Sequence, residues 1–244
     1  MNHLLRTFVL SLVLVLTTRI LHAQEKKERR ARVPHKYLFF PYPLDKNWHV
    51  SLGFTLTTMP EDITEEVQIR APAGDFHVLR KLGKGFYLDG RVNFQVLQNH
   101  ISIGPRWAKV LNDRFSVSVG DDMAWWFGNL NVSGFNTKAH GWLNYPNASI
   151  GYRFKKQVLM TLKGEASITL SDESRVGEQL LENNRTRFNG VGGTILIEQP
   201  FYKNKSIILG FKGQYTNFYW QTWPLFETFD RTIFYPEIIV GFIL

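Results

Sequence analysis

Two adjacent carboxylates, Asp121 and Asp122, come closer than any other residues of the sequence to a catalytic pair. Two carboxyl groups that share one site can divide the roles of general acid and general base between them. The pair also interrupts a segment in which apolar and polar residues alternate, and a β-bulge there would restore the apolar face. A bulge, or a salt bridge to Arg106 or Arg153, is the interpretation we prefer, with the acid pair as the alternative.

The other residue types point away from catalysis. The sequence has no cysteine, which excludes disulfides, cysteine-ligated zinc and a cysteine nucleophile. It holds no Gly-x-Ser-x-Gly, Walker, zinc-type histidine or EF-hand motif. The histidines after residue 23 have no histidine four residues along the chain: His35, His49, His77, His100 and His140. We therefore predict no catalytic residue, no metal and no cofactor, and expect a protein that is not an enzyme.

Residues 1–23 have the pattern of a signal peptide. Arg6 supplies a positive start, Phe8–Leu16 is the apolar stretch, and Leu21-His22-Ala23 could precede a cleavage site. The apolar stretch is too short to cross a bilayer as a helix, and no later stretch approaches the roughly 18 apolar residues that a spanning helix needs. A mature chain that crosses a membrane must therefore do so as a barrel.

The formal net charge of +8 is concentrated near the start of the mature chain. Within residues 24–42, the stretch Gln24–Lys36 holds six basic side chains against two acidic ones. Such a run is typical of a solvated, disordered tail, which we place in the periplasm; contact with an acidic periplasmic partner is the alternative. Because the positive charge belongs to this tail and not to a folded face, a nucleic-acid partner is not expected.

From residue 43 to 244, apolar and polar residues alternate in segment after segment. This period of two is typical of β-strands that present opposite faces to different surroundings. About ten strands result, or eight if weak segments such as 74–82 fail. The expected strands cover 48–57, 74–82, 86–96, 101–110, 115–127, 141–154, 158–169, 189–199, 207–216 and 232–244.

The linkers alternate in length. Those at 111–113, 155–157 and 202–204 are tight, whereas 128–140, 171–187 and 222–230 are longer and polar. Short turns at one end and long loops at the other favour an antiparallel up-and-down transmembrane β-barrel, in which the short turns are periplasmic. A soluble barrel or sandwich of lipocalin type has the same alternation with the faces reversed, and stays the alternative fold.

Two sets of side chains favour the membrane. The polar face carries charges of both signs, which can neutralise one another inside a closed barrel: Asp89, Arg91, Arg106, Arg153, Lys163, Glu165, Glu198, Lys212 and Glu237. Large aromatic residues lie toward the strand ends, where a membrane barrel has its interfacial girdles: Trp48, Trp107, Trp125, Trp126, Trp142, Tyr219 and Trp220.

The last strand carries a resemblance to a known family. Phe234–Leu244 alternates apolar residues and has an aromatic, Phe242, close to its end. This resembles the assembly signal of bacterial outer-membrane β-barrels, although Leu244 stands where the terminal aromatic is usual. The resemblance implies a small barrel in the outer membrane of a Gram-negative bacterium, with lipids as its surroundings and the barrel-assembly machinery as a partner during biogenesis.

Three functions fit such a chain. A barrel of about ten strands is only slightly wider than one that side chains fill, so paired charges can close its lumen. We therefore expect a structural or interaction-type barrel with a largely closed lumen. The alternatives are a narrow channel for ions or small solutes, whose selectivity the same charges would set, and a membrane-embedded hydrolase or acyltransferase.

Overall fold

The computed structural model describes residues 36–44, 46–61, 69–132, 135–154, 157–177, 179–183, 187–202, 205–225 and 232–244. The expected leader and most of the basic stretch lie outside these residues. Within the described part, no helix is long and apolar enough to cross a bilayer.

Strands make up nearly all of the regular structure. Their order is β1 Trp48–Thr58, β2 Arg70–Gly83, β3 Phe86–Phe94, β4 Gln98–Val110, β5 Phe115–Val132, β6 Phe135–Phe154, β7 Val158–Val176, β8 Gln179–Asn183, β9 Arg187–Pro200, β10 Ser206–Thr216 and β11 Ile233–Ile243. A short 3-10 helix, η1 (Trp220–Leu225), lies between β10 and β11.

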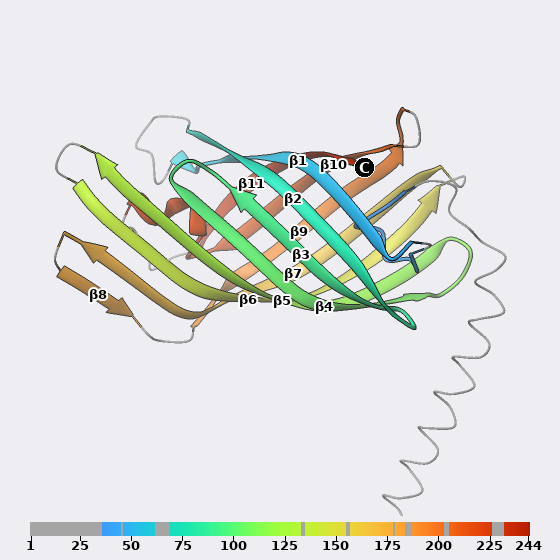
Figure 1. The fold of residues 1–244 in the computed structure, drawn as a ribbon, viewed down its shortest axis with the longest axis horizontal. Coiled ribbons are helices and arrows are strands. Elements are labelled where there is room, and N and C mark those ends of the chain that lie inside the picture. The colour runs from blue at the N-terminus through green and yellow to red at the C-terminus, as the bar shows by residue number, and fades with distance from the viewer. Residues whose placement is uncertain are drawn as a thin grey trace, which may run out of the picture. The chain divides into compact units, whose positions relative to one another are not determined.

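Ten of these strands form a closed antiparallel barrel (Figure 1). Chain neighbours pair from β1 to β7, β7 pairs with β9, and β11 closes the ring on β1. Among the described pairings β8 contacts only β7, so it extends the sheet beyond the ring. The predicted fold class and strand number are confirmed, and the doubtful segment 74–82 is part of β2.

The two ends of the barrel differ. The linkers between β2 and β3, β4 and β5, β6 and β7, and β9 and β10 are all short, and the start of β1 and the end of β11 lie with them. We call this the turn end. At the opposite, loop end, the connections from β1 to β2 and from β10 to β11 are longer, and β5, β6, β7 and β8 continue past their neighbours (Figure 1).

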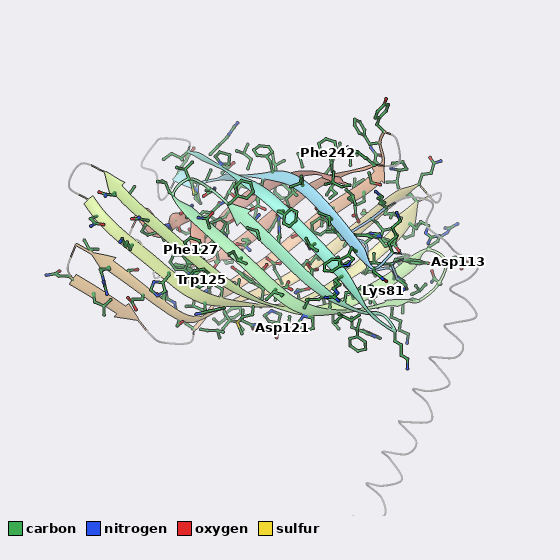
Figure 2. The ribbon with its side chains drawn as sticks, viewed as in Figure 1. Lys81, Asp113, Asp121, Trp125, Phe127 and Phe242 are labelled. Carbon is green, nitrogen blue, oxygen red and sulfur yellow. The ribbon has the colours of Figure 1, made fainter. Side chains whose placement is uncertain are left out.

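Alternation along each strand separates an apolar exterior from a polar interior. On β11, for example, Phe234, Ile238 and Phe242 are exposed, whereas Glu237 is buried. Phe242 points outward from the wall in Figure 2. The exterior is therefore a surface suited to lipid, and a soluble barrel with an apolar interior is excluded by this direction of the side chains.

The expected bulge at Gly120-Asp121-Asp122 is wrong. The register between β5 and β6 runs without a shift from Phe115↔Tyr152 to Val132↔Phe135. The alternation that looked broken in the sequence continues, because Asp121 occupies an outward position that an apolar residue would normally fill. The alternation looks broken in the sequence because a polar residue occupies a lipid-facing position, and not because a residue is inserted.

Candidate functional site: the occluded lumen

Two ion-pair groups line the part of the lumen formed by β2, β3 and β4. The Arg91 guanidinium donates hydrogen bonds to both oxygens of Asp75, over 2.7 and 3.2 Å, and the Asn93 amide adds a third at 3.0 Å. His77 contacts Asp89, whose second oxygen lies 3.6 Å from Arg106. Both carboxylates are therefore compensated, as burial requires.

A third group lies across the lumen on β5, β7 and β10. Glu165 accepts hydrogen bonds from Lys212 at 2.6 Å and from Gln214 at 3.0 Å, and its other oxygen is 3.3 Å from the Lys163 ammonium. The same ammonium lies 3.6 Å from Asp122. Because these side chains form ion pairs across the interior, they occupy the lumen and do not surround an open pore.

The space left between these groups is small. A central cavity of about 80 Å³ is lined by residues of all three charged groups and by Tyr145. Because a buried water needs roughly 10–15 Å³ measured in this way, the cavity holds only a few water molecules. No solute larger than that fits this cavity.

At the turn end, the segment Tyr37–Leu44 folds back into the barrel and fills it. Tyr37, Leu38, Phe40 and Leu44 are almost completely buried. We call this segment the plug. The predicted tail boundary at residue 42 is therefore wrong, because the apolar and aromatic side chains of this segment are buried in the turn end of the barrel and do not belong to a solvated tail.

Two buried side chains of the wall hold the backbone of the plug. Glu198, with no exposed surface, accepts hydrogen bonds from the N–H groups of Leu38, Phe39 and Phe40 over 2.6–3.1 Å. Arg106 donates to the carbonyl oxygens of Leu38 and Phe39 at 3.0 and 2.7 Å. Charged groups thus satisfy an irregular backbone that would otherwise be buried without partners.

Packing also fits the plug to the wall. A Cβ at Gly151 on β6 would lie 2.5 Å from the Phe40 ring and 2.7 Å from the Pro41 ring, so this position must be glycine. The Arg153 guanidinium lies over the Tyr42 ring, 5.1 Å from its centroid, in cation–π contact. The turn end is therefore closed by complementary shape as well as by hydrogen bonds.

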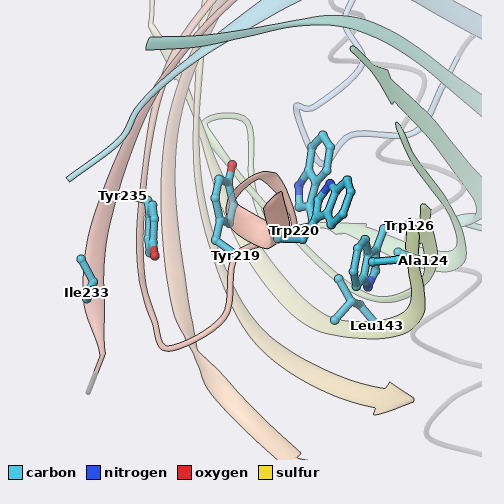
Figure 3. Close-up of a cluster of buried hydrophobic side chains, with 9 residues drawn as sticks. Ala124, Trp126, Leu143, Tyr219, Trp220, Ile233 and Tyr235 are labelled. Carbon is cyan, nitrogen blue, oxygen red and sulfur yellow. The ribbon is translucent and has the colours of Figure 1, made fainter. Parts of the chain in front are cut away.

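At the loop end, η1 folds inward and covers the lumen. We call residues 217–225 the cap. Its Tyr219, Trp220 and Trp223 are buried in a cluster with Trp126 of β5 and Tyr235 of β11 (Figure 3). The Trp223 indole lies directly against Gly128, where a Cβ would collide with the ring. The Tyr219 hydroxyl donates to Glu237 at 2.9 Å and anchors the cap to the wall below it.

The predicted interfacial aromatics divide into two sets. Trp48, Trp107, Trp125 and Trp142 lie on the outer face, the first two toward the turn end and the last two nearer the loop end. Trp126, Tyr219 and Trp220 are buried inside, so their assignment to a girdle is wrong. Trp126 follows Trp125 on one strand and must face the other way, while the cap carries the other two inward.

The carboxylate pair is likewise divided by the wall. Asp121 projects from the outer surface (Figure 2), where the Asn144 amide donates to it at 2.6 Å. Asp122 points into the lumen and accepts from Asn147 at 2.9 Å. Because the two carboxyl groups lie on opposite sides of a β-sheet, they cannot act as one acid–base pair, and neither is bonded to Arg106 or Arg153.

The predicted lumen charges fall into three places. Asp89, Arg91, Lys163, Glu165 and Lys212 form the central ion-pair groups. Glu198 and Arg153 contact the plug, Arg106 contacts both the plug and Asp89, and Glu237 contacts the cap. Sequence reasoning missed Asp75, His77 and Asp122, although the inward parity of their strands places each among the charges already named.

Comparison with solved structures supports the barrel fold. An outer-membrane channel from Pseudomonas putida F1 matches with a TM-score of 0.50 at 5% identity, over 86% of this chain and 100% of that one. The chain has the fold of an outer-membrane β-barrel. The translocator domain of the autotransporter NalP from Neisseria meningitidis also matches (TM-score 0.46, 8% identity, 96% of each chain), as does the attachment invasion locus protein Ail of Yersinia pestis (0.42, 10%, 80% and 95%).

No protein-family model and no curated protein matches the sequence. At these identities the structural likeness extends to the fold and not to what the neighbours bind or transport. The apolar exterior and this fold agree with the outer membrane as the location of the chain. Within the described residues, no group of three or more His, Asp or Glu side chains is arranged to hold a metal ion.

Proposed function

We propose that this protein is an integral outer-membrane barrel that does not conduct in its resting state and acts through its loop-end surface. The observation that carries the proposal is the burial of one segment inside each end of the barrel. The plug fills the turn end, the cap fills the loop end, and the cavity between them measures only about 80 Å³.

The loop end offers the surface for an interaction. There β5 to β8 extend beyond the closed ring of strands. The exposed side chains of this extension include His140, Glu173 and Arg175. Glu173 lies 3.9 Å from both His140 and Arg175, a long distance for either contact, and at least a third of each side chain is exposed. Such pairs contribute little to stability, so these groups stay available to a partner.

The narrow channel stays the second candidate because charged and polar side chains line the central part of the lumen. Conduction would require both the plug and the cap to leave their places. An enzyme acting on lipid or peptide has less support, since Asp121 and Asp122 face opposite sides of the wall and the contact of His140 with Glu173 is long, at 3.9 Å.

Single-channel recording tests the proposal. The protein extracted from outer membranes is inserted into a planar bilayer, with heat-modifiable gel mobility as the check that it is folded. We expect no conductance steps. Steady, reproducible steps from folded protein, reduced or altered in selectivity by Arg91→Ala or Glu165→Gln, would overturn the closed-barrel proposal in favour of the channel.

A further inference from the structure

The layer beneath the cap contains buried polar atoms that no described residue satisfies. His100 on β4 is 7% exposed, yet neither ring nitrogen has a hydrogen-bond partner. The same holds for both amide atoms of Gln221, the carbonyl oxygen of Gln98, and the indole N–H groups of Trp126 and Trp223. Buried polar groups are normally paired, so a cluster of this kind needs an explanation.

The two closures of the barrel differ in how their backbone and side chains are held. At the turn end, Glu198 and Arg106 satisfy five backbone groups of the plug. The cap contacts the lumen wall mostly by ring packing. Its hydrogen bonds to the wall in the described residues join the Tyr219 hydroxyl to Glu237 and Thr57, and the side-chain amide of Gln98 to the backbone carbonyl of Gln221. The plug is therefore held more firmly than the cap. The unpaired polar atoms beneath the cap could form hydrogen bonds if the cap were displaced.

The chemistry of the unpaired atoms defines what they could bind. Two indole N–H groups and the Gln221 amide donate, while the side-chain carbonyl oxygens of Gln98 and Gln221 accept. The His100 ring offers one of each, and it stacks on Trp220 with 5.2 Å between centroids. Hydroxyl groups match such a mixture, because each both donates and accepts. Aromatic faces suit the apolar C–H faces of a ring that carries hydroxyls.

Charge narrows the ligand further. The charged side chains that line the cavity beside His100 are already paired, Arg91 with Asp75 and Glu165 with Lys163 and Lys212. The Glu237 carboxylate accepts hydrogen bonds from Thr57 and Tyr219. A charged ligand would bring an unpaired charge into a buried layer, which is strongly unfavourable. We infer that the cap covers a binding site for a small, uncharged, polyhydroxylated ligand of the carbohydrate class.

The site is filled by the cap in the resting structure, since the neighbouring cavity of about 80 Å³ is too small for such a ligand. Binding therefore requires residues 217–225 to lift, which exposes His100 and Trp126 from the wall and Gln221 from the cap. The inference rests on the proposed closure at the loop end. It adds that the closure is displaced by a particular kind of molecule.

Tryptophan emission reports the movement, because Trp126, Trp220 and Trp223 all change their surroundings when the cap lifts. The protein, extracted from outer membranes in lauryldimethylamine oxide to avoid sugar-bearing detergents, is titrated with maltose and, in parallel, with glucuronate. We expect a saturable change with maltose and one at least tenfold weaker with glucuronate. His100→Phe keeps the ring on Trp220 but removes both nitrogens, and Gln221→Leu removes the amide; each is expected to weaken binding at least fivefold.

Trp125→Phe is the matched control, because this tryptophan faces outward on the strand that carries Trp126. It is expected to leave the titration unchanged. The inference would be overturned if maltose caused no saturable change in emission. It would also be overturned if His100→Phe and Gln221→Leu bound maltose as tightly as the unaltered protein. The bilayer recordings distinguish failure of this site from failure of the closure. A barrel that neither conducts nor binds maltose refutes only the binding site. Steady conductance from unliganded protein refutes the closure itself.

Discussion

Replacing Glu198 by alanine should release the plug without unfolding the barrel. The carboxylate has no exposed surface and accepts three backbone N–H groups from Leu38, Phe39 and Phe40. Hydrogen bonds to a charged acceptor each contribute about 1.5–3 kcal/mol net. Losing the buried carboxylate also removes its own desolvation penalty, which offsets part of the loss. We therefore expect the plug to be held less tightly by about 2–4 kcal/mol, the balance of these two effects.

Hydrogen exchange followed by mass spectrometry measures this release directly. At about 1.4 kcal/mol per factor of ten, protection of a peptide covering residues 36–44 should fall roughly 30- to 1,000-fold. Protection of β5 and β6 should not change. Thr194→Ala, on the same strand and also buried in the lumen, is the matched control and should leave the plug protected.

Either of two results would refute this reasoning. Unchanged exchange of the plug in Glu198→Ala would mean that packing alone holds the segment. Loss of protection throughout the barrel would mean that Glu198 stabilises the whole fold and not one segment. Gly151→Ala approaches the same release by a steric route, since the added methyl group would meet Phe40 and Pro41, and it should reproduce the local effect.

Three further predictions concern the wall and the cap. Arg91→Met should lower the free energy of unfolding by about 3–5 kcal/mol because it leaves Asp75 buried without its cation, and adding Asp75→Asn should recover much of the loss; urea titration in micelles measures both. Asp121→Asn should raise stability by about 1–2 kcal/mol in the same assay, because it removes a charge from the lipid face midway along β5; a decrease would show that the charge has a stabilising partner. Gly128→Ala should push Trp223 from its seat and speed hydrogen exchange in residues 217–225, while Gly164→Ala, where an added Cβ meets nothing, should not.

The sequence was sufficient for the barrel because period-two alternation recurs in every strand, including the weak stretch that became β2. The type of residue alone does not give the direction of the side chain where two like residues are adjacent on a strand. Trp125 and Trp126, like Asp121 and Asp122, stand next to each other on a strand and must face opposite sides. Applying that parity strictly would have placed Trp126 and Asp122 in the lumen from the start.

The plug and the cap could not be predicted in the same way. Tyr37–Leu44 has no periodicity, and its burial follows from long-range contacts with Glu198 and Arg106, which are remote in sequence. The cap is a loop whose aromatic residues suit a membrane interface as well as a barrel interior. In both cases composition gives the affinity for an apolar surface, and only the three-dimensional arrangement decides which surface that is.

Planar-bilayer conductance of a double variant tests the central claim, closure at both ends, most directly. Gly151→Ala is designed to open the turn end and Gly128→Ala the loop end, each by one methyl group. We expect no conductance from the unaltered protein or from either single variant, and current steps only when both substitutions are combined in folded protein. Conductance from the unaltered barrel, or full conductance from one substitution alone, would contradict it.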